Sequence, residues 1–188
     1  MKPNDPSASY AVGLDLAAKS GRCSGAAVID VLRGEVASLR CLSNDEDIIT
    51  FLRGFRGSVV AIDAPLTAQP RMRDVDRLMY KSGLRVLPPS FRWMKQLTLR
   101  GYELTVRLND LGYTVIETHP RSVLKYVGVE DFRELLMLLG IKLDEPLLLN
   151  VHLKDALTAA AVAYCYVTGC TASVGSHDGV IYLVKRLR

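Results

Sequence analysis

The sequence predicts an α/β protein with a mixed five-stranded sheet, three strands antiparallel and two parallel, flanked by helices and carrying a helical insert. Three strand-like runs lie within residues 9–42 and are separated by short turns, which join antiparallel strands. Two later runs, 58–63 and 113–118, are short and mainly apolar, as in parallel strands buried on both faces. The chain has 188 residues, 49% of them hydrophobic and 23% charged, so we expect residues 1–188 to form a single globular domain.

The three antiparallel strands are expected over residues 9–17, 24–31 and 35–42. The first connection is the turn at 19–22, and the second contains Arg33-Gly34. Gly residues at both turns permit the tight backbone that such hairpins need. The three runs therefore form a meander.

A helix over about 45–55 follows, because Ser43-Asn44 offers a cap and acidic residues occupy the first turn. The helix ends at Gly57, and Pro65 stops the strand over 58–63 from continuing. Residues 67–112 carry no strand pattern and predict an inserted helical region with helices near 71–82 and 93–111. The segment Leu87-Pro88-Pro89-Ser90 separates these two helices.

The chain after the strand over 113–118 is predicted to be mainly helical. Helix signals and breaks lie at the following positions: a start at Pro120, a helix over 131–139 ended by Gly140, a break at Pro146 and a long helix over 151–168 ended by Gly169. The run 180–184 allows a short terminal strand.

Four acidic residues occupy positions where such a fold gathers ligands. Asp15, Asp63 and Glu117 each close a predicted strand, and Asp155 lies near the start of the alanine-rich helix. The first and fourth strands should be parallel neighbours, so Asp15 and Asp63 would share the carboxyl edge of the sheet. His152 precedes Asp155 by three residues and lies on the same helical face.

Clustered carboxylates repel one another unless a cation is present, and their hard oxygen ligands suit Mg²⁺ or Mn²⁺. We therefore expect Asp15, Asp63 and Asp155 to hold metal, with Glu117 and His152 assisting catalysis. The structural alternative is that single strand-end acids cap turns. Glu117 lies on the strand farther from Asp15 and could instead orient a basic residue such as Arg121.

The predicted insert is basic. It contains nine Lys or Arg and four acids, a net charge of +5, whereas the whole chain carries +4. Positive charge attracts phosphates and aromatic faces can stack on unpaired bases. We expect Arg71, Arg73 and Arg77 of the insert, with Lys19 of the first turn, to bind substrate, whereas Trp93 and the other insert aromatics could equally form a local core.

Several classes are excluded or disfavoured. The four cysteines form no Cys-x-x-Cys pair and only three histidines occur, so a zinc site is not expected and the thiols should be reduced. No Gly-x-x-x-x-Gly-Lys-Ser/Thr loop occurs. No apolar run reaches the roughly 18 residues of a membrane span, and the N-terminus lacks the apolar stretch of a signal peptide. We expect a cytoplasmic protein with no membrane association.

Five segments in order resemble the DUF429 family, whose members are predicted nucleases of the ribonuclease H-like fold. The segments are Val12–Ala17, Ala61–Leu66, Arg71–Leu78, Val115–Arg121 and His152–Ala160. The resemblance spans about residues 10–184 and implies a ribonuclease H-like core with Asp15 on the first strand, Asp63 on the fourth and Asp155 on the final helix. This is similar to the resolvase and transposase branches of that fold.

The leading hypothesis is a nuclease that hydrolyses phosphodiester bonds in DNA or RNA with Mg²⁺ or Mn²⁺ at a two-metal carboxylate site. One alternative is a nucleic-acid-binding protein with a catalytically inactive ribonuclease H-like fold. The other is an ATP-dependent phosphotransferase of the actin-like superfamily. Those proteins usually pair two such domains, whereas this chain is expected to form one.

Overall fold

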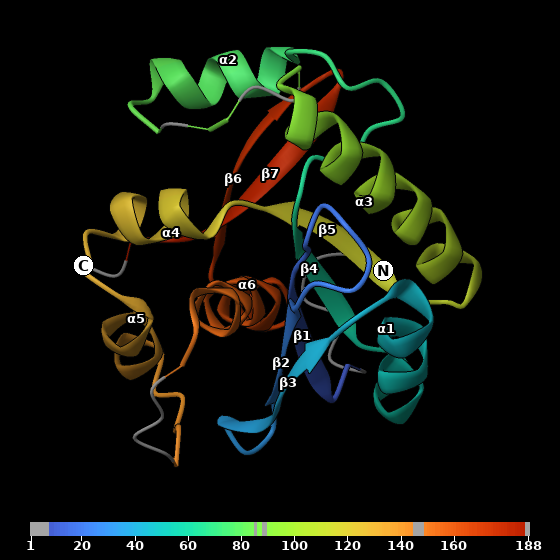
Figure 1. The fold of residues 1–188 in the computed structure, drawn as a ribbon. Helices are drawn as coiled ribbons and strands as arrows, with labels where there is room; N and C mark the ends of the chain where they lie inside the picture. Colours follow the sequence, from blue (N-terminus) through green and yellow to red (C-terminus); the bar gives the residue numbers. More distant parts are fainter. Residues whose placement is uncertain (1–7, 85, 88–89, 145–148, 187–188) are drawn as a thin grey trace.

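The computed structural model describes residues 8–84, 86–87, 90–144 and 149–186. Its strands form one sheet in the order β3-β2-β1-β4-β5-β7-β6 (Figure 1). The bounds are β1 Tyr10–Asp15, β2 Ser24–Asp30, β3 Glu35–Leu42, β4 Val59–Asp63, β5 Thr114–Thr118, β6 Thr171–Ser176 and β7 Gly179–Val184. Strands β1, β4, β5 and β7 pair in parallel, and the pairs β1–β2, β2–β3 and β6–β7 are antiparallel. The mixed α/β class and the antiparallel meander are confirmed.

The described helices agree with the predicted ones to within a few residues at each end. Their bounds are α1 Asp45–Leu52, extended by a 3₁₀ turn over Arg53–Phe55, α2 Asp74–Lys81, α3 Arg92–Asp110, α4 Pro120–Val127, α5 Phe132–Leu138 and α6 Val151–Thr168. The predicted breaks at Pro88-Pro89 and at Pro146 lie outside the described residues. No helix in the described ranges has both the length and the apolar character needed to cross a membrane.

The sheet is the middle of three layers. Alternate residues of its central strands point to opposite faces, so Ala11 and Ala61 join the core beneath α6, whereas Val12 and Val60 join the core beneath α1 and α3. Helices α4 and α5 pack beside α6, and Figure 1 shows α1 and α3 on the other side of the sheet. Two hydrophobic cores therefore hold the strand ends in fixed positions.

Helix α6 lies unusually close to the sheet because glycines face it. A Cβ atom on Gly13 of β1 would overlap the backbone of Ala156 and Ala160, and one on Gly25 of β2 would overlap the backbone of His152. The α6 side of this contact is built largely from small alanine side chains. The close approach sets the first turn of α6 directly against the end of β1 and the start of β2.

The expected count of five strands was too low. The sheet also includes β7, which the run 180–184 had allowed, and β6, which had not been expected. Strand β6 has the sequence Thr-Ala-Ser-Val-Gly-Ser and lies at the edge of the sheet, paired only with β7. Its residues are small and polar because it has little core to bury, so its sequence lacks the apolar pattern by which strands are recognised.

The expectation of reduced thiols was also wrong, since the structure contains the disulfides Cys23–Cys41 and Cys165–Cys170. The antiparallel register pairs Gly25 with Cys41, which brings the start of β2 to the end of β3. After α6, Gly169 adopts a left-handed conformation (φ 85°) and returns the chain to the last helical turn. Both pairings thus follow from tertiary and capping geometry, which a list of cysteine spacings does not reveal.

Candidate metal-binding active site

The first two acids of the site are direct neighbours. Strands β1 and β4 pair in parallel with Asp15 opposite Asp63, and adjacent strands lie about 4.8 Å apart. Asp15 continues the row of Ala11 and Gly13, and Asp63 continues the row of Val59 and Ala61; both rows face α6. The two carboxylates therefore leave the sheet on the side where α6 begins.

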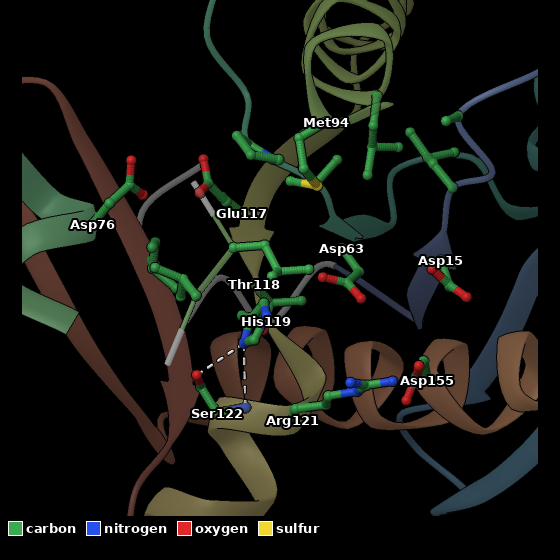
Figure 2. Close-up of a pocket in the computed structure, with 18 of the residues that line it drawn as sticks. Asp15, Asp63, Asp76, Met94, Glu117, Thr118, His119, Arg121, Ser122 and Asp155 are labelled. Atoms are coloured by element: carbon green, nitrogen blue, oxygen red, sulfur yellow. Dashed lines mark hydrogen bonds between the residues drawn. The ribbon is translucent and has the colours of Figure 1, made fainter. Parts of the chain in front are cut away.

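Helix α6 supplies the rest of the acidic group from its first two turns. Its N-cap Asn150 accepts the backbone N–H of Leu153 at 3.0 Å, which fixes the start of the helix. His152 Nδ1 lies 2.7 Å from Asp15 Oδ2. Asp155 follows His152 by three residues on α6. Figure 2 shows Asp155 beneath the strand ends that carry Asp15 and Asp63. We call Asp15, Asp63 and Asp155 the acidic triad.

Burial raises the pKa of all three carboxyl groups, and repulsion by neighbouring carboxylates adds to the rise for Asp15 and Asp63. Burial raises the pKa of Asp15 to about 6; the hydrogen bond with His152 opposes this rise and Asp155 adds to it. Burial, together with the charges of Asp15 and Asp155, holds the pKa of Asp63 well above its usual value. Burial likewise raises the pKa of Asp155. The ionised triad is therefore electrostatically unfavourable by itself and would be stabilised by a cation.

The triad fits a divalent metal in donor chemistry. Within the described residues, neither Asp63 nor Asp155 has a hydrogen-bond or ion-pair partner, so their oxygens are free to act as ligands. The three carboxylates do not all approach within 4.8 Å of one another, the separation at which one ion would bridge them.

Arg121 is a cationic neighbour of the triad. It lies in the first turn of α4, directly after β5, and Figure 2 shows its side chain extending toward Asp155. Its positive charge lowers the pKa of Asp15, Asp63 and Asp155 and so partly offsets the burial that raises them. From the sequence, Arg121 was expected only as a residue that Glu117 could orient. Its place three residues after the end of a parallel strand was the available signal.

Glu117 belongs to a different cluster. It points away from the α6 face, because Ile116 of the same strand packs in the α6 core and Val115 packs in the opposite core. Its carboxylate accepts two hydrogen bonds from Arg73, at 2.7 and 2.5 Å, and one from the backbone N–H of Leu66 at 2.9 Å. Glu117 thus orients Arg73 rather than Arg121.

The predicted substrate-binding residues are dispersed. Lys19 and Arg71 are exposed and do not line the cavity, and Arg77 is an exposed partner of Asp74 at 2.7 Å. Arg73 is 4% exposed in its side chain and is shared between Glu117 and Asp76, which it contacts at 2.8 Å. The structure thus engages Arg73 inside the protein, with two carboxylates rather than a phosphate. Arg85, also counted in the basic insert, lies outside the described residues.

A cavity of about 740 Å³ opens above the triad. It reaches from the triad to the Arg73–Glu117–Asp76 cluster, and α3 covers it with Trp93, Met94 and Leu97. Apart from Arg73, the basic residues that line it were not expected from the sequence to bind substrate: Arg22, Arg121 and Lys125. These lie in the β1–β2 connection and in α4, so spacing along the chain does not bring them together.

His119 lines the same cavity. It is the N-cap of α4, and its Nδ1 accepts the backbone N–H of Ser122 at 3.3 Å and lies 2.8 Å from the Ser122 hydroxyl. Burial, together with the charge of Arg121, lowers the pKa of His119 to about 4. The ring is therefore neutral near pH 7, with its proton on Nε2, because Nδ1 is an acceptor.

A second group of potential ligands lies on the surface. Asp74, His177 and Asp178 are the described residues whose ligand atoms all approach within 4.8 Å. Asp178 accepts the backbone N–H groups of Asp74 and Val75 at 2.7 and 3.2 Å, so its carboxylate caps the N-terminus of α2. This group joins the β6–β7 turn to the N-terminus of α2. It shares no residue with the acidic triad.

No family model and no curated protein matches the chain, so the likeness to DUF429 remains a resemblance. Among solved structures, RuvC from Thermus thermophilus in complex with a Holliday junction substrate aligns with 21% identity and a TM-score of 0.49, over 85% of this chain and 96% of that chain. Another structure of Thermus thermophilus RuvC aligns with 20% identity, the same TM-score and the same coverage. The large terminase nuclease from the thermophilic phage G20c aligns with 15% identity and a TM-score of 0.31, over 87% of this chain and 84% of that chain. At these scores we draw no conclusion about activity from the similarity.

Proposed function

We propose that the protein is a divalent-metal-dependent nuclease that hydrolyses phosphodiester bonds. The observation that carries the proposal is the acidic triad. Asp15 and Asp63 stand opposite each other on parallel strands and face α6, from which Asp155 and His152 approach. Carboxylates with raised pKa values and free oxygens, set in a cavity, are typical of a site that holds Mg²⁺ or Mn²⁺.

Asp15, Asp63 and Asp155 would hold the metal, which when bound supplies an activated water and stabilises the leaving oxygen of a phosphodiester. His152 hydrogen-bonds Asp15 and so fixes the direction of that carboxylate. In its neutral form His152 can also accept a proton from a water in the cavity that it lines. Arg121, beside the triad, offers a guanidinium to a phosphate oxygen.

The basic residues around the cavity favour a polyanionic substrate. Arg22, Arg121 and Lys125 line it from two separate elements, and the whole chain carries a net charge of +4. Phosphate contacts of this kind position a nucleic acid without reading its sequence. We therefore propose DNA or RNA as the substrate.

The deciding experiment compares Asp15→Asn and Asp155→Asn with the wild-type protein. Cleavage of labelled DNA and RNA is followed with and without Mg²⁺ or Mn²⁺, and Mn²⁺ binding is measured by calorimetry. Both variants should lose cleavage and the heat of Mn²⁺ binding. Asp110→Asn is the matched control, because Asp110 is exposed at the far end of α3.

Cleavage that persists in Asp15→Asn would place the chemistry elsewhere. Wild-type protein that binds nucleic acid but gives no heat with Mn²⁺ would instead support the inactive binding protein.

A further inference from the structure

The cavity joins two chemically different halves. On the sheet side lie the acidic triad, which suits metal and phosphate. On the α3 side the cavity is lined by Trp93, Met94 and Leu97, and Ala64 of the β4–α2 connection also lines it. Figure 2 shows Met94 pointing from α3 toward the strand end that carries Asp63, beside Glu117. We call Trp93, Met94 and Leu97 the apolar roof.

The metal chemistry of the acidic triad does not require the apolar roof. Met94 is 6% exposed, whereas Trp93 is 50% exposed and Tyr80 of α2, which also lines the cavity, is 42% exposed. Two half-exposed aromatic side chains at one cavity offer flat apolar faces to a ligand. Aromatic faces of this kind stack on nucleobases, whatever the base identity.

The cavity also offers a directional polar group. The Nδ1 atom of His119 is occupied by Ser122, so the ring presents an Nε2–H donor. A neutral donor suits an uncharged acceptor such as a base carbonyl. A base bound beneath the apolar roof would thus meet one hydrogen-bond donor as well as a stacking surface.

The size of the cavity also suits a single nucleobase. A cavity of about 740 Å³ lies within the range of about 300–1,000 Å³ in which small ligands are enclosed. Continuous duplex keeps its bases stacked in the helix, and enzymes that need access to one base must receive it unpaired or flipped out.

We propose that the apolar roof receives one unpaired nucleobase, whose adjoining phosphate lies on the acidic triad, so that the protein cleaves nucleic acid at an unpaired or extruded nucleotide. The inference rests on the proposed nuclease function and adds to it a substrate class. Stacking between Trp93 and the base holds the scissile phosphate at the triad, and Arg22 and Lys125 contact the flanking backbone.

Trp93 is the only tryptophan of the chain, so its fluorescence reports directly on the apolar roof. The probes are a matched duplex, the same duplex with one bulged nucleotide, that duplex with the bulged base replaced by an abasic site, and a free mononucleotide. Each is prepared as DNA and as RNA and titrated in Ca²⁺ in place of Mg²⁺. Cleavage of each oligonucleotide in Mg²⁺ is measured separately.

The bulged duplex should quench Trp93 emission and bind at least about 10-fold more tightly than the matched or abasic duplex. Trp93→Ala, tested by anisotropy of labelled oligonucleotides, should lower that preference by about 5- to 150-fold, the range for loss of one stacked aromatic residue. Tyr102→Ala is the control, because Tyr102 is a partly exposed aromatic on the same helix that does not line the cavity.

Mg²⁺-dependent cleavage with equal affinity for matched, bulged and abasic duplexes would overturn the base-receiving role and leave the nuclease proposal intact. A free mononucleotide that binds as tightly as the bulged duplex would overturn it in favour of a small-molecule substrate. If no oligonucleotide is cleaved in Mg²⁺, the nuclease proposal itself is overturned, and the inference with it.

Discussion

The imidazole of His152 lies 2.7 Å from the carboxylate of Asp15 through its Nδ1 atom, which joins the first turn of α6 to the end of β1. Because an ionised carboxylate only accepts hydrogen bonds, Nδ1 carries the proton and donates it to Asp15 Oδ2. The side chain of Asp15 is 13% exposed and that of His152 43%. His152 therefore fixes a buried ligand from a position that solvent reaches.

His152→Ala should weaken Mn²⁺ binding and cleavage by about 10- to 100-fold, the usual cost of removing a residue that orients a metal ligand. His152→Gln retains a donor and should recover part of the loss. Gln96→Ala is the control, since Gln96 is exposed on α3 and does not line the cavity. Calorimetry and cleavage rates measure the effect, and a His152→Ala variant with the wild-type Kd for Mn²⁺ would remove His152 from the site.

The raised pKa of Asp63 predicts an unusual pH dependence of stability. Between the ordinary pKa of 3.8 and its raised value, the folded protein keeps a proton that the unfolded chain has released. Stability in the absence of metal therefore falls as pH rises through this window, the reverse of the behaviour of a paired carboxylate. The loss is complete once the pH exceeds the raised pKa.

Asp63→Asn removes this contribution. The variant should gain stability relative to wild type on going from about pH 4 to about pH 8 in metal-free urea melts. Mg²⁺ should raise the Tm of the wild type at the higher pH and leave that of the variant unchanged. A stability difference that is equal at both pH values would show that Asp63 ionises normally.

Much of the fold followed from the sequence because its signals are local. Apolar runs mark β1, β2, β4 and β5, and capping residues such as Asn44 mark helix starts within a few residues. The first turn of α2 was placed three residues early, at 71 rather than 74. Its true start is fixed by Asp178, which is distant in sequence and bonds the backbone N–H groups of that turn.

The candidate site was harder to predict because it depends on which face of the sheet each side chain leaves. Asp15 and Asp63 share the α6 face, as the alternation in their own strands implies. The same alternation sends Glu117 to the other face, where it meets Arg73. Position at a strand end does not by itself distinguish Glu117 from Asp15 and Asp63. Arg22, Arg121 and Lys125 gather at the cavity through tertiary packing, for which the sequence holds no periodic pattern.

The ion pairs of Arg73 predict a structural role for this residue. Its side chain is 4% exposed and bonds Glu117 and Asp76, whose side chains are 8% and 3% exposed. Arg73→Ala leaves both carboxylates buried without a cationic partner and should destabilise the protein by about 3–5 kcal/mol. Arg77→Ala removes an exposed pair with Asp74 and should cost about 0–1 kcal/mol. Equal urea-denaturation midpoints for the two variants would contradict the structural assignment.

The close contact between β2 and α6 predicts that the site depends on a glycine outside it. A Cβ on Gly25 would overlap the backbone carbonyl of His152, so Gly25→Ala must push the first turn of α6 away from the strand ends. We expect a loss of stability of about 1–3 kcal/mol, as for overpacking of a core, together with weaker Mn²⁺ binding because His152 and Asp155 move with that turn. Gly54→Ala is the matched control, since a Cβ there meets nothing within 4 Å. Urea melts and calorimetry on both variants test the effect. A Gly25→Ala protein that is destabilised but binds Mn²⁺ with unchanged affinity would show that the triad does not depend on how closely α6 approaches the sheet.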